Sequence, residues 1–160
     1  MKRPLSNTNF YDINENMVVD DFHTWRNILC NRRISPQLLQ LISKFDVGQI
    51  KEVRLGIEHG LSEACIRTYV EPKLSYWLME QVRLGFEDGL SISQVEMYIH
   101  LDDAEGMRQM RLGIKNHLTK EQLEALIKLP PVYMCTAREE FEFQNAVSSI
   151  KSLIEHYPKD

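Results

Sequence analysis

Hydrophobic residues in the middle of the chain recur at helical spacing, and the whole pattern returns after about 28 residues. The triplet Arg-Leu-Gly marks the register, because it occurs at residues 54–56, 83–85 and 111–113. Around each triplet, hydrophobic residues stand four and one before the arginine and three and seven after it, which places them on one face of an amphipathic helix. A fixed period of this kind indicates stacked structural repeats.

Capping residues divide each repeat into a long and a short helix. Residues that can cap a helix N-terminus stand before both kinds of segment: Ser35, Asp46, Ser62, Ser75, Ser91, Asp102 and Thr119. Residues suited to the left-handed position that ends a helix follow the three long segments: Gly60, Gly89 and His117. Each repeat therefore reads as a short helix, a turn, a long helix and a turn.

We predict an all-α fold, an α-solenoid-like stack of about four helix–turn–helix repeats with capping helices at both ends. The repeats span roughly residues 34–60, 61–89, 90–117 and 118–145. A helix over 17–33 covers the first repeat, and 1–16 are irregular, so 17–160 form a single domain. After Pro130-Pro131, a final helix capped by Thr136 runs to about residue 157.

The repeated glycines and arginines carry the sharpest questions. A glycine inside a helix costs about 1 kcal/mol relative to alanine, so Gly56, Gly85 and Gly113 suggest close approach of a neighbouring helix to the backbone, or a ligand contact. Two interpretations of the arginines Arg54, Arg83 and Arg111 stay open. They pair with acids of their own or the adjacent repeat (Glu58, Glu87, Glu52 and Glu80), or they form an exposed ladder that binds an acidic partner or phosphates.

Composition narrows the function classes. The chain has 160 residues and a net charge of −4, which does not favour general nucleic-acid binding. Its three cysteines lie far apart, which is typical of a reducing cytoplasm. We see no hydrophobic run long enough to span a membrane, no metal-ligand spacing and no catalytic motif. The sequence therefore predicts a cytoplasmic protein that is not an enzyme and needs no cofactor or metal ion.

Protein binding is the function that the sequence favours, with an extended surface of the stack as the interface. The candidate contact residues lie on the long helices: Glu52, Arg54, Tyr76, Trp77, Glu80, Arg83, Arg108 and Arg111. A variant is an acidic inhibitor that occupies the basic groove of a nucleic-acid enzyme. The alternative is a nucleic-acid-binding regulator whose arginine ladder also includes Arg26, Arg32 and Arg33. The protein is expected to be a monomer or an end-to-end homodimer.

The segments 49–62 (QIKEVRLGIEHGLS) and 79–91 (MEQVRLGFEDGLS) resemble a known helical repeat. It is the repeat of tandem Q-M-x-x-I-R-L-G-L-E-x-G-L units in uncharacterised proteins of gut Firmicutes, their phages and mobile elements. The resemblance covers residues ~45 to ~128, about half the chain. It implies an all-helical repeat array, and the genetic setting implies a regulator or an inhibitor of a host defence protein, of the anti-CRISPR kind.

Overall fold

The computed structural model describes residues 26, 28, 34–70 and 74–155, and within them every regular element is an α-helix. The predicted all-α class is confirmed. Short and long helices alternate along the chain. In order they are α2 (Pro36–Ile42), α3 (Val47–Glu58), α4 (Glu63–Tyr69), α5 (Tyr76–Glu87), α6 (Ile92–Glu96), α7 (Ala104–Lys115), α8 (Lys120–Leu126) and α9 (Pro131–Glu155).

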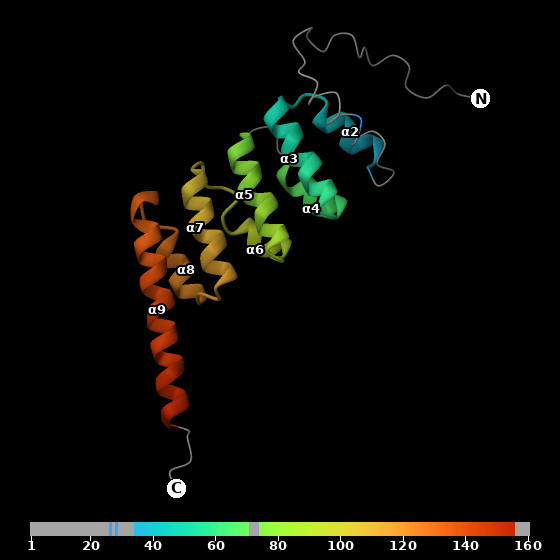
Figure 1. Ribbon diagram of the computed structural model, residues 1–160. Helices are drawn as coiled ribbons and strands as arrows, with labels where there is room; N and C mark the ends of the chain where they lie inside the picture. Colours follow the sequence, from blue (N-terminus) through green and yellow to red (C-terminus); the bar gives the residue numbers. More distant parts are fainter. Residues whose placement is uncertain (1–25, 27, 29–33, 71–73, 156–160) are drawn as a thin grey trace, which may run out of the picture.

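The long helices lie side by side in chain order, each beginning at the same edge of the array (Figure 1). Helix α3 packs on α5, α5 on α7, and α7 on α9, while α4, α6 and α8 pack beside the long helices. The core between them is built from residues of the predicted hydrophobic face, such as Val53, Val82, Met107 and Met110, all almost completely buried. The Arg-Leu-Gly triplets therefore fall at matching places in α3, α5 and α7.

The boundaries of α2 to α8 follow the predicted caps with one correction. Side chains of Ser35, Asp46, Ser62, Ser91 and Thr119 each accept a hydrogen bond from the backbone N–H three residues on. Ser75 also holds the N-cap position of α5, without a side-chain hydrogen bond. The prediction of Asp102 as the cap of α7 is wrong. The cap is Asp103, whose backbone is extended and whose Oδ1 accepts from the Gly106 N–H at 2.7 Å.

The left-handed residues that end the long helices are confirmed. Gly60, Gly89 and His117 have φ angles of 81°, 85° and 61°. After each of them, the chain folds back, and the N–H groups of Leu61, Leu90 and Leu118 reach the carbonyls of the three triplet glycines at 2.9–3.0 Å. The left-handed residue and the hydrogen bond that follows it end α3, α5 and α7 at the same position relative to the triplet.

Helix α9 departs from the prediction at its start. It begins at Pro131 and not at Thr136, which lies inside the helix. A proline is tolerated in the first turn because its missing N–H has no partner there in any helix. The helix is 25 residues long against 12 for α7, and its second half extends past the rest of the array (Figure 1).

Near the two ends of the chain, the structure describes only some of the residues. Of the predicted helix over 17–33, the structure describes Arg26 and Ile28, which are helical, and Ile28 is buried. The rest of that helix, the predicted irregular segment 1–16 and the predicted end of the last helix at about residue 157 lie outside the described residues.

The repeated glycines allow the close approach that the sequence predicts, and at Gly56 and Gly85 the group that approaches the backbone is a tyrosine side chain. A Cβ on Gly56 would lie 2.0 Å from the Tyr69 hydroxyl, and one on Gly85 would lie 2.1 Å from the Tyr98 hydroxyl. Each hydroxyl donates to a carbonyl of the same long helix, Glu52 at 3.3 Å and Gln81 at 3.4 Å. Glycine at these two places lets a tyrosine, at the end of α4 or two residues after the end of α6, close the core while its hydroxyl keeps a hydrogen bond.

The third glycine is less constrained than the first two. Residue 126, the counterpart of Tyr69 and Tyr98, is a leucine. A Cβ on Gly113 would meet Leu118 Cδ1 at 3.0 Å, followed by two other leucine methyl groups at 3.3 and 3.5 Å. These are ends of flexible side chains, so the contact can relax.

Candidate functional site

The arginine ladder lies between the long helices. Arg83 of α5 is 5% exposed, and its Nε donates to Glu52 Oε2 of α3 at 2.7 Å. Its Nη1 donates to Glu87 Oε1, one turn further along α5, at 2.6 Å. Glu52 is 5% exposed as well. Arg83 thus makes the ion pairs of the first interpretation, and the second interpretation, in which Arg83 and Glu52 are exposed contact residues, is wrong for these two.

Burial and pairing act in opposite directions on these carboxyl groups. Burial raises the pKa of Glu52, and the hydrogen bond from Arg83 offsets only part of that effect. Burial also disfavours the charge on Glu87, but hydrogen bonds from Arg83 and His59 together outweigh it and lower its pKa. The ionised form of Glu87 is therefore favoured. Its Oε1 lies 2.7 Å from Nδ1 of His59, the residue that follows α3.

The next arginine is paired differently because lysine replaces the acid one turn on. Arg111 of α7 is also buried, so its predicted exposure is wrong. Its Nη1 donates to Asp88, the residue after the end of α5, which also accepts from Lys115 Nζ at 2.6 Å. Burial opposes ionisation of Asp88, but these two cations lower its pKa. Within the described residues, Arg111 Nε and Gln81 Oε1 are buried without hydrogen-bond partners.

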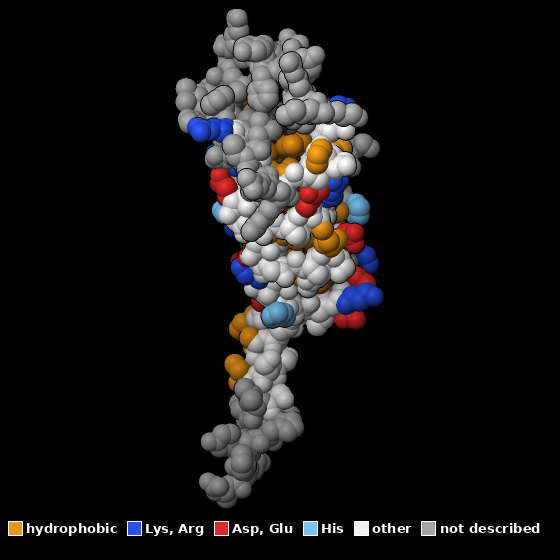
Figure 2. Space-filling view, turned by 90° about the vertical axis from the view of Figure 1, so that its right-hand side faces the viewer, with side chains coloured by type: hydrophobic (Ala, Val, Ile, Leu, Met, Phe, Trp, Pro, Cys, Tyr) orange, Lys and Arg blue, Asp and Glu red, His pale blue; other side chains and the backbone are white. Residues whose placement is uncertain are grey.

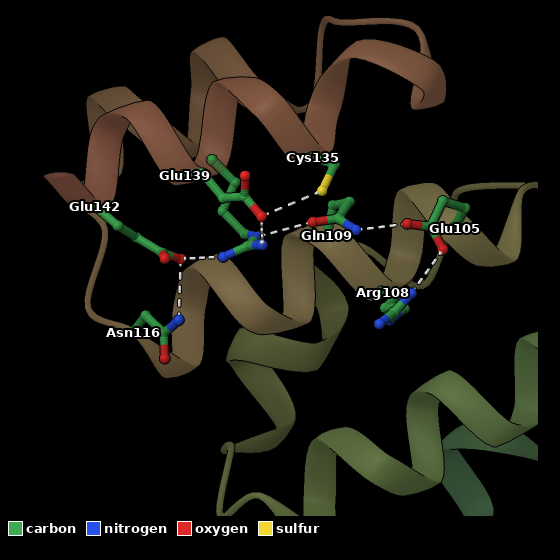
Figure 3. Close-up of polar contacts among 8 residues, drawn as sticks. Glu105, Arg108, Gln109, Asn116, Cys135, Glu139 and Glu142 are labelled. Carbon is green, nitrogen blue, oxygen red and sulfur yellow. Dashed lines mark hydrogen bonds and ion pairs between the residues drawn. The ribbon is translucent and has the colours of Figure 1, made fainter.

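A fourth arginine, Arg138 of α9, completes the ladder and was missed by sequence reasoning. Its Nε donates to Gln109 Oε1 of α7 at 2.7 Å, and its Nη1 donates to Glu142 at 2.6 Å (Figure 3). Arg138 is buried like Arg83. The signal was present, because a hydrophobic residue stands four before Arg138 (Met134) and another three after it (Phe141), although Leu-Gly does not follow.

Two kinds of contact recur between neighbouring long helices, and we call them the interhelix rungs. In the first, an arginine reaches the residue two before the arginine position of the preceding helix: Glu52–Arg83 and Gln109–Arg138. In the second, the residue five after the arginine position meets the residue four after it on the next helix: His59–Glu87, Asp88–Lys115 and Asn116–Glu142, at 2.6–2.9 Å. The rungs therefore stabilise the register of the array.

The remaining charged candidates lie nearer the surface. Arg54 is half-buried, 3.7 Å from Glu58 on the same helix. Arg108 is exposed and lies 3.3 Å from Glu105 on α7. Glu80 is half-buried on α5. Exposed ion pairs within one helix contribute about 0–1 kcal/mol, so Arg108 is available to a partner at little cost.

The two aromatic candidates form an ordered pair at the edge where the long helices begin. The rings of Tyr76 and Trp77 have centroids 4.2 Å apart. Tyr76 leans on α3 at Gly48, where a Cβ would lie 2.8 Å from the tyrosine ring. Trp77 is 57% exposed, and Val47 at the start of α3 is exposed at the same edge. We call Val47, Tyr76 and Trp77 the aromatic edge.

The arrangement limits the chemistry available. Arg83 and Arg111 already face carboxylates inside the array, so they are poorly placed to neutralise phosphates. Arg26 is exposed, while Arg32 and Arg33 lie outside the described residues. Among the described residues, no group of His, Cys, Asp or Glu is placed to hold a metal ion, and no helix is long and apolar enough to cross a membrane. No protein-family model, curated protein or solved structure matches the chain.

Proposed function

We propose that this protein is a non-enzymatic α-solenoid of four helix–turn–helix repeats that binds another protein through the aromatic edge. The supporting observation is the exposure of Trp77 in an ordered setting. A large aromatic side chain that is half in water is unusual on a surface, and tryptophan and tyrosine are enriched among the residues that dominate protein interfaces.

Pre-ordering strengthens this assignment. Trp77 packs on Tyr76, and Tyr76 packs on the bare backbone of Gly48, so the side chains are held before a partner arrives. These side chains therefore lose little conformational entropy when a partner binds, because they are already held in place. The rungs hold α3 and α5 in register beneath the edge, which gives the buried arginines a supporting role.

Surrounding charges suit a protein partner. Glu80 follows Trp77 by one helical turn, and the exposed Arg108 lies on the adjacent helix α7. A hydrophobic centre with charges of both signs around it is the usual composition of a protein interface. Under this proposal the partner is a host protein, and regulation or inhibition of a host defence protein is the role that the resemblance implies.

Affinity capture from host lysate, quantified by mass spectrometry with and without nuclease, tests the proposal. Trp77→Ala should weaken binding of a specific protein at least about thirtyfold and lower its recovery accordingly, since interface hot spots contribute about 2 kcal/mol or more. Met97→Ala is the control, because Met97 is also exposed but lies at the end of α6. Equal recovery by both variants, or loss of every partner after nuclease treatment, would contradict the proposal.

A further inference from the structure

The interhelix rungs end at α9, where the position five after the arginine is hydrophobic and no longer polar. On the outer side of each earlier long helix, polar residues stand two before and five after the arginine position, as Glu52 and His59 do on α3. On α9 the corresponding residues are Thr136 and Phe143, and Phe143 is 65% exposed. A further repeat of the same kind would place a polar or charged residue against Phe143. The outer face of α9 is therefore not built to receive another such repeat.

The second half of α9 carries a hydrophobic stripe. Phe143, Val147 and Ile150 recur at spacings of four and three residues, and Ile150 is 57% exposed while Val147 is half-buried. Hydrophobic side chains gather along one edge of the protruding part of the molecule (Figure 2). Between Phe143 and Ile150 the sequence has no charged residue. This spacing is the one by which a helix packs along a single partner helix.

The protruding helix also needs a partner for its own stability. Within the described residues, its last hydrogen bonds to the array join Asn145 to Gln122 of α8, at 2.9 and 3.0 Å, and the helix runs on from there to Glu155. Isolated helices of about 12–15 residues are marginal in water, and most helices are stabilised by packing of a hydrophobic face.

We propose that the stripe Phe143, Val147 and Ile150 pairs with the same stripe of a second copy, in antiparallel orientation, to form a homodimer. Charge along α9 selects this occupant and this direction. Arg138 already pairs with Glu139 and Glu142, so Glu140 is the exposed acid before the stripe. Lys151 is the first charged residue after the stripe, four before Glu155. Antiparallel pairing places Glu140 of each copy toward Lys151 of the other. Parallel pairing would bring acid to acid and lysine to lysine.

The pairing gives a closed two-fold assembly. Each copy presents the same surface and receives the same surface, so the contact does not propagate. The aromatic edge lies where the long helices begin, while the stripe lies toward the far end of α9 (Figure 1). The dimer therefore presents two aromatic edges, and it can form whether or not a partner protein is bound there.

Sedimentation velocity of the full chain over a concentration series tests the pairing. The unmodified protein should show a concentration-dependent dimer, and the double change Phe143→Glu with Ile150→Glu should weaken it at least about thirtyfold, which corresponds to about 2 kcal/mol. The matched control Ser148→Glu with Ser149→Glu adds the same charge to exposed positions of the same helix, off the stripe. A monomer at all concentrations, or a dimer that both double variants affect equally, overturns the proposal.

A charge exchange tests the direction. Lys151→Glu should weaken the dimer about two- to fivefold, the effect of an exposed ion pair, and adding Glu140→Lys in the same chain should restore it. A parallel dimer would gain nothing from the exchange, because like charges would still meet. Helix content and melting temperature of each variant verify that the fold is kept. Loss of the dimer without restoration by the exchange overturns the antiparallel arrangement.

Discussion

The contact between α3 and α5 and the contact between α7 and α9 use the same helical positions with different chemistry. At the first, Arg83 meets the buried carboxylate of Glu52, and at the second, Arg138 meets the neutral amide of Gln109. The short helices differ in parallel, since Tyr69 fills the space over Gly56 while Leu126 lies near Gly113. The architecture thus requires an acceptor for the arginine and a filled space over the glycine, but it does not require one residue type at either place.

The largest expected effect comes from removing an acceptor. Glu52→Leu leaves Arg83 with Glu87 alone at a site where its guanidinium is largely buried, so we expect about 4 kcal/mol of lost stability. Glu52→Gln should cost about 1 kcal/mol, because Gln109 already performs this task for Arg138. Urea denaturation measures both. Equal losses for leucine and glutamine would show that charge, and not hydrogen bonding, is the requirement at this position.

The two glycine sites should separate next. Gly56→Ala forces a methyl group against the buried Tyr69 hydroxyl, and we expect a loss of about 3 kcal/mol. Gly113→Ala should change stability by less than about 1 kcal/mol, because the leucine methyl groups can move and alanine favours the helix. Thermal and urea unfolding give both values.

A second substitution identifies the cause of the Gly56 effect. Tyr69→Leu copies the arrangement at Leu126, so the double variant should be more stable than the sum of the two single losses predicts, by about 1 kcal/mol or more. Simple addition of the two losses would mean that the hydroxyl is not what excludes alanine.

Low pH should weaken the contact between α5 and α7, because this contact depends on the carboxylate of Asp88. The folded pKa of Asp88 is lowered, so its stabilisation is fully present above the ordinary carboxyl pKa of about 4 and is lost as pH falls below that value through the lower folded pKa. Asp88→Asn should cost about 2 kcal/mol at pH 7, as hydrogen bonds to charged groups do, and less at pH 3. The free energy of unfolding measured from pH 7 to pH 3 gives the comparison, with the exposed Asp102→Asn as control. A cost for Asp88→Asn that does not change with pH would exclude this role for Asp88.

Local signals carried most of the fold in advance. Hydroxyl and carboxylate caps and the left-handed residues depend only on nearby backbone groups, so Ser91, Thr119 and Gly89 could be placed from sequence. The period also placed the core face. The start of α9 was placed wrongly because Thr136 and Glu139 match a capping pattern. Pro131 is equally suited to the first turn of a helix, and the helix begins there.

The candidate site was harder to predict because it depends on contacts across helices. A period shows which residues are equivalent, but not how far one helix is rotated toward the next, so the sequence left open whether Arg83 and Arg111 pair inside the array or face solvent. Arg138 was overlooked because leucine and glycine do not follow it. Trp77 could be named as a candidate from the sequence. Its support by Tyr76, which packs on Gly48, could not, because that contact joins two helices.

The second kind of rung has a consequence for how this chain can lengthen. Asp88 suits the lysine that faces it from α7, and Glu87 suits the histidine that faces it from α3. A tandem duplication of the α4–α5 pair would instead set Asp88 against a second Glu87, acid beside acid in a partly buried place. The charges of each repeat therefore match those of its present neighbours. Electrostatic repulsion opposes both the insertion of further copies of a repeat and a change in the order of the repeats.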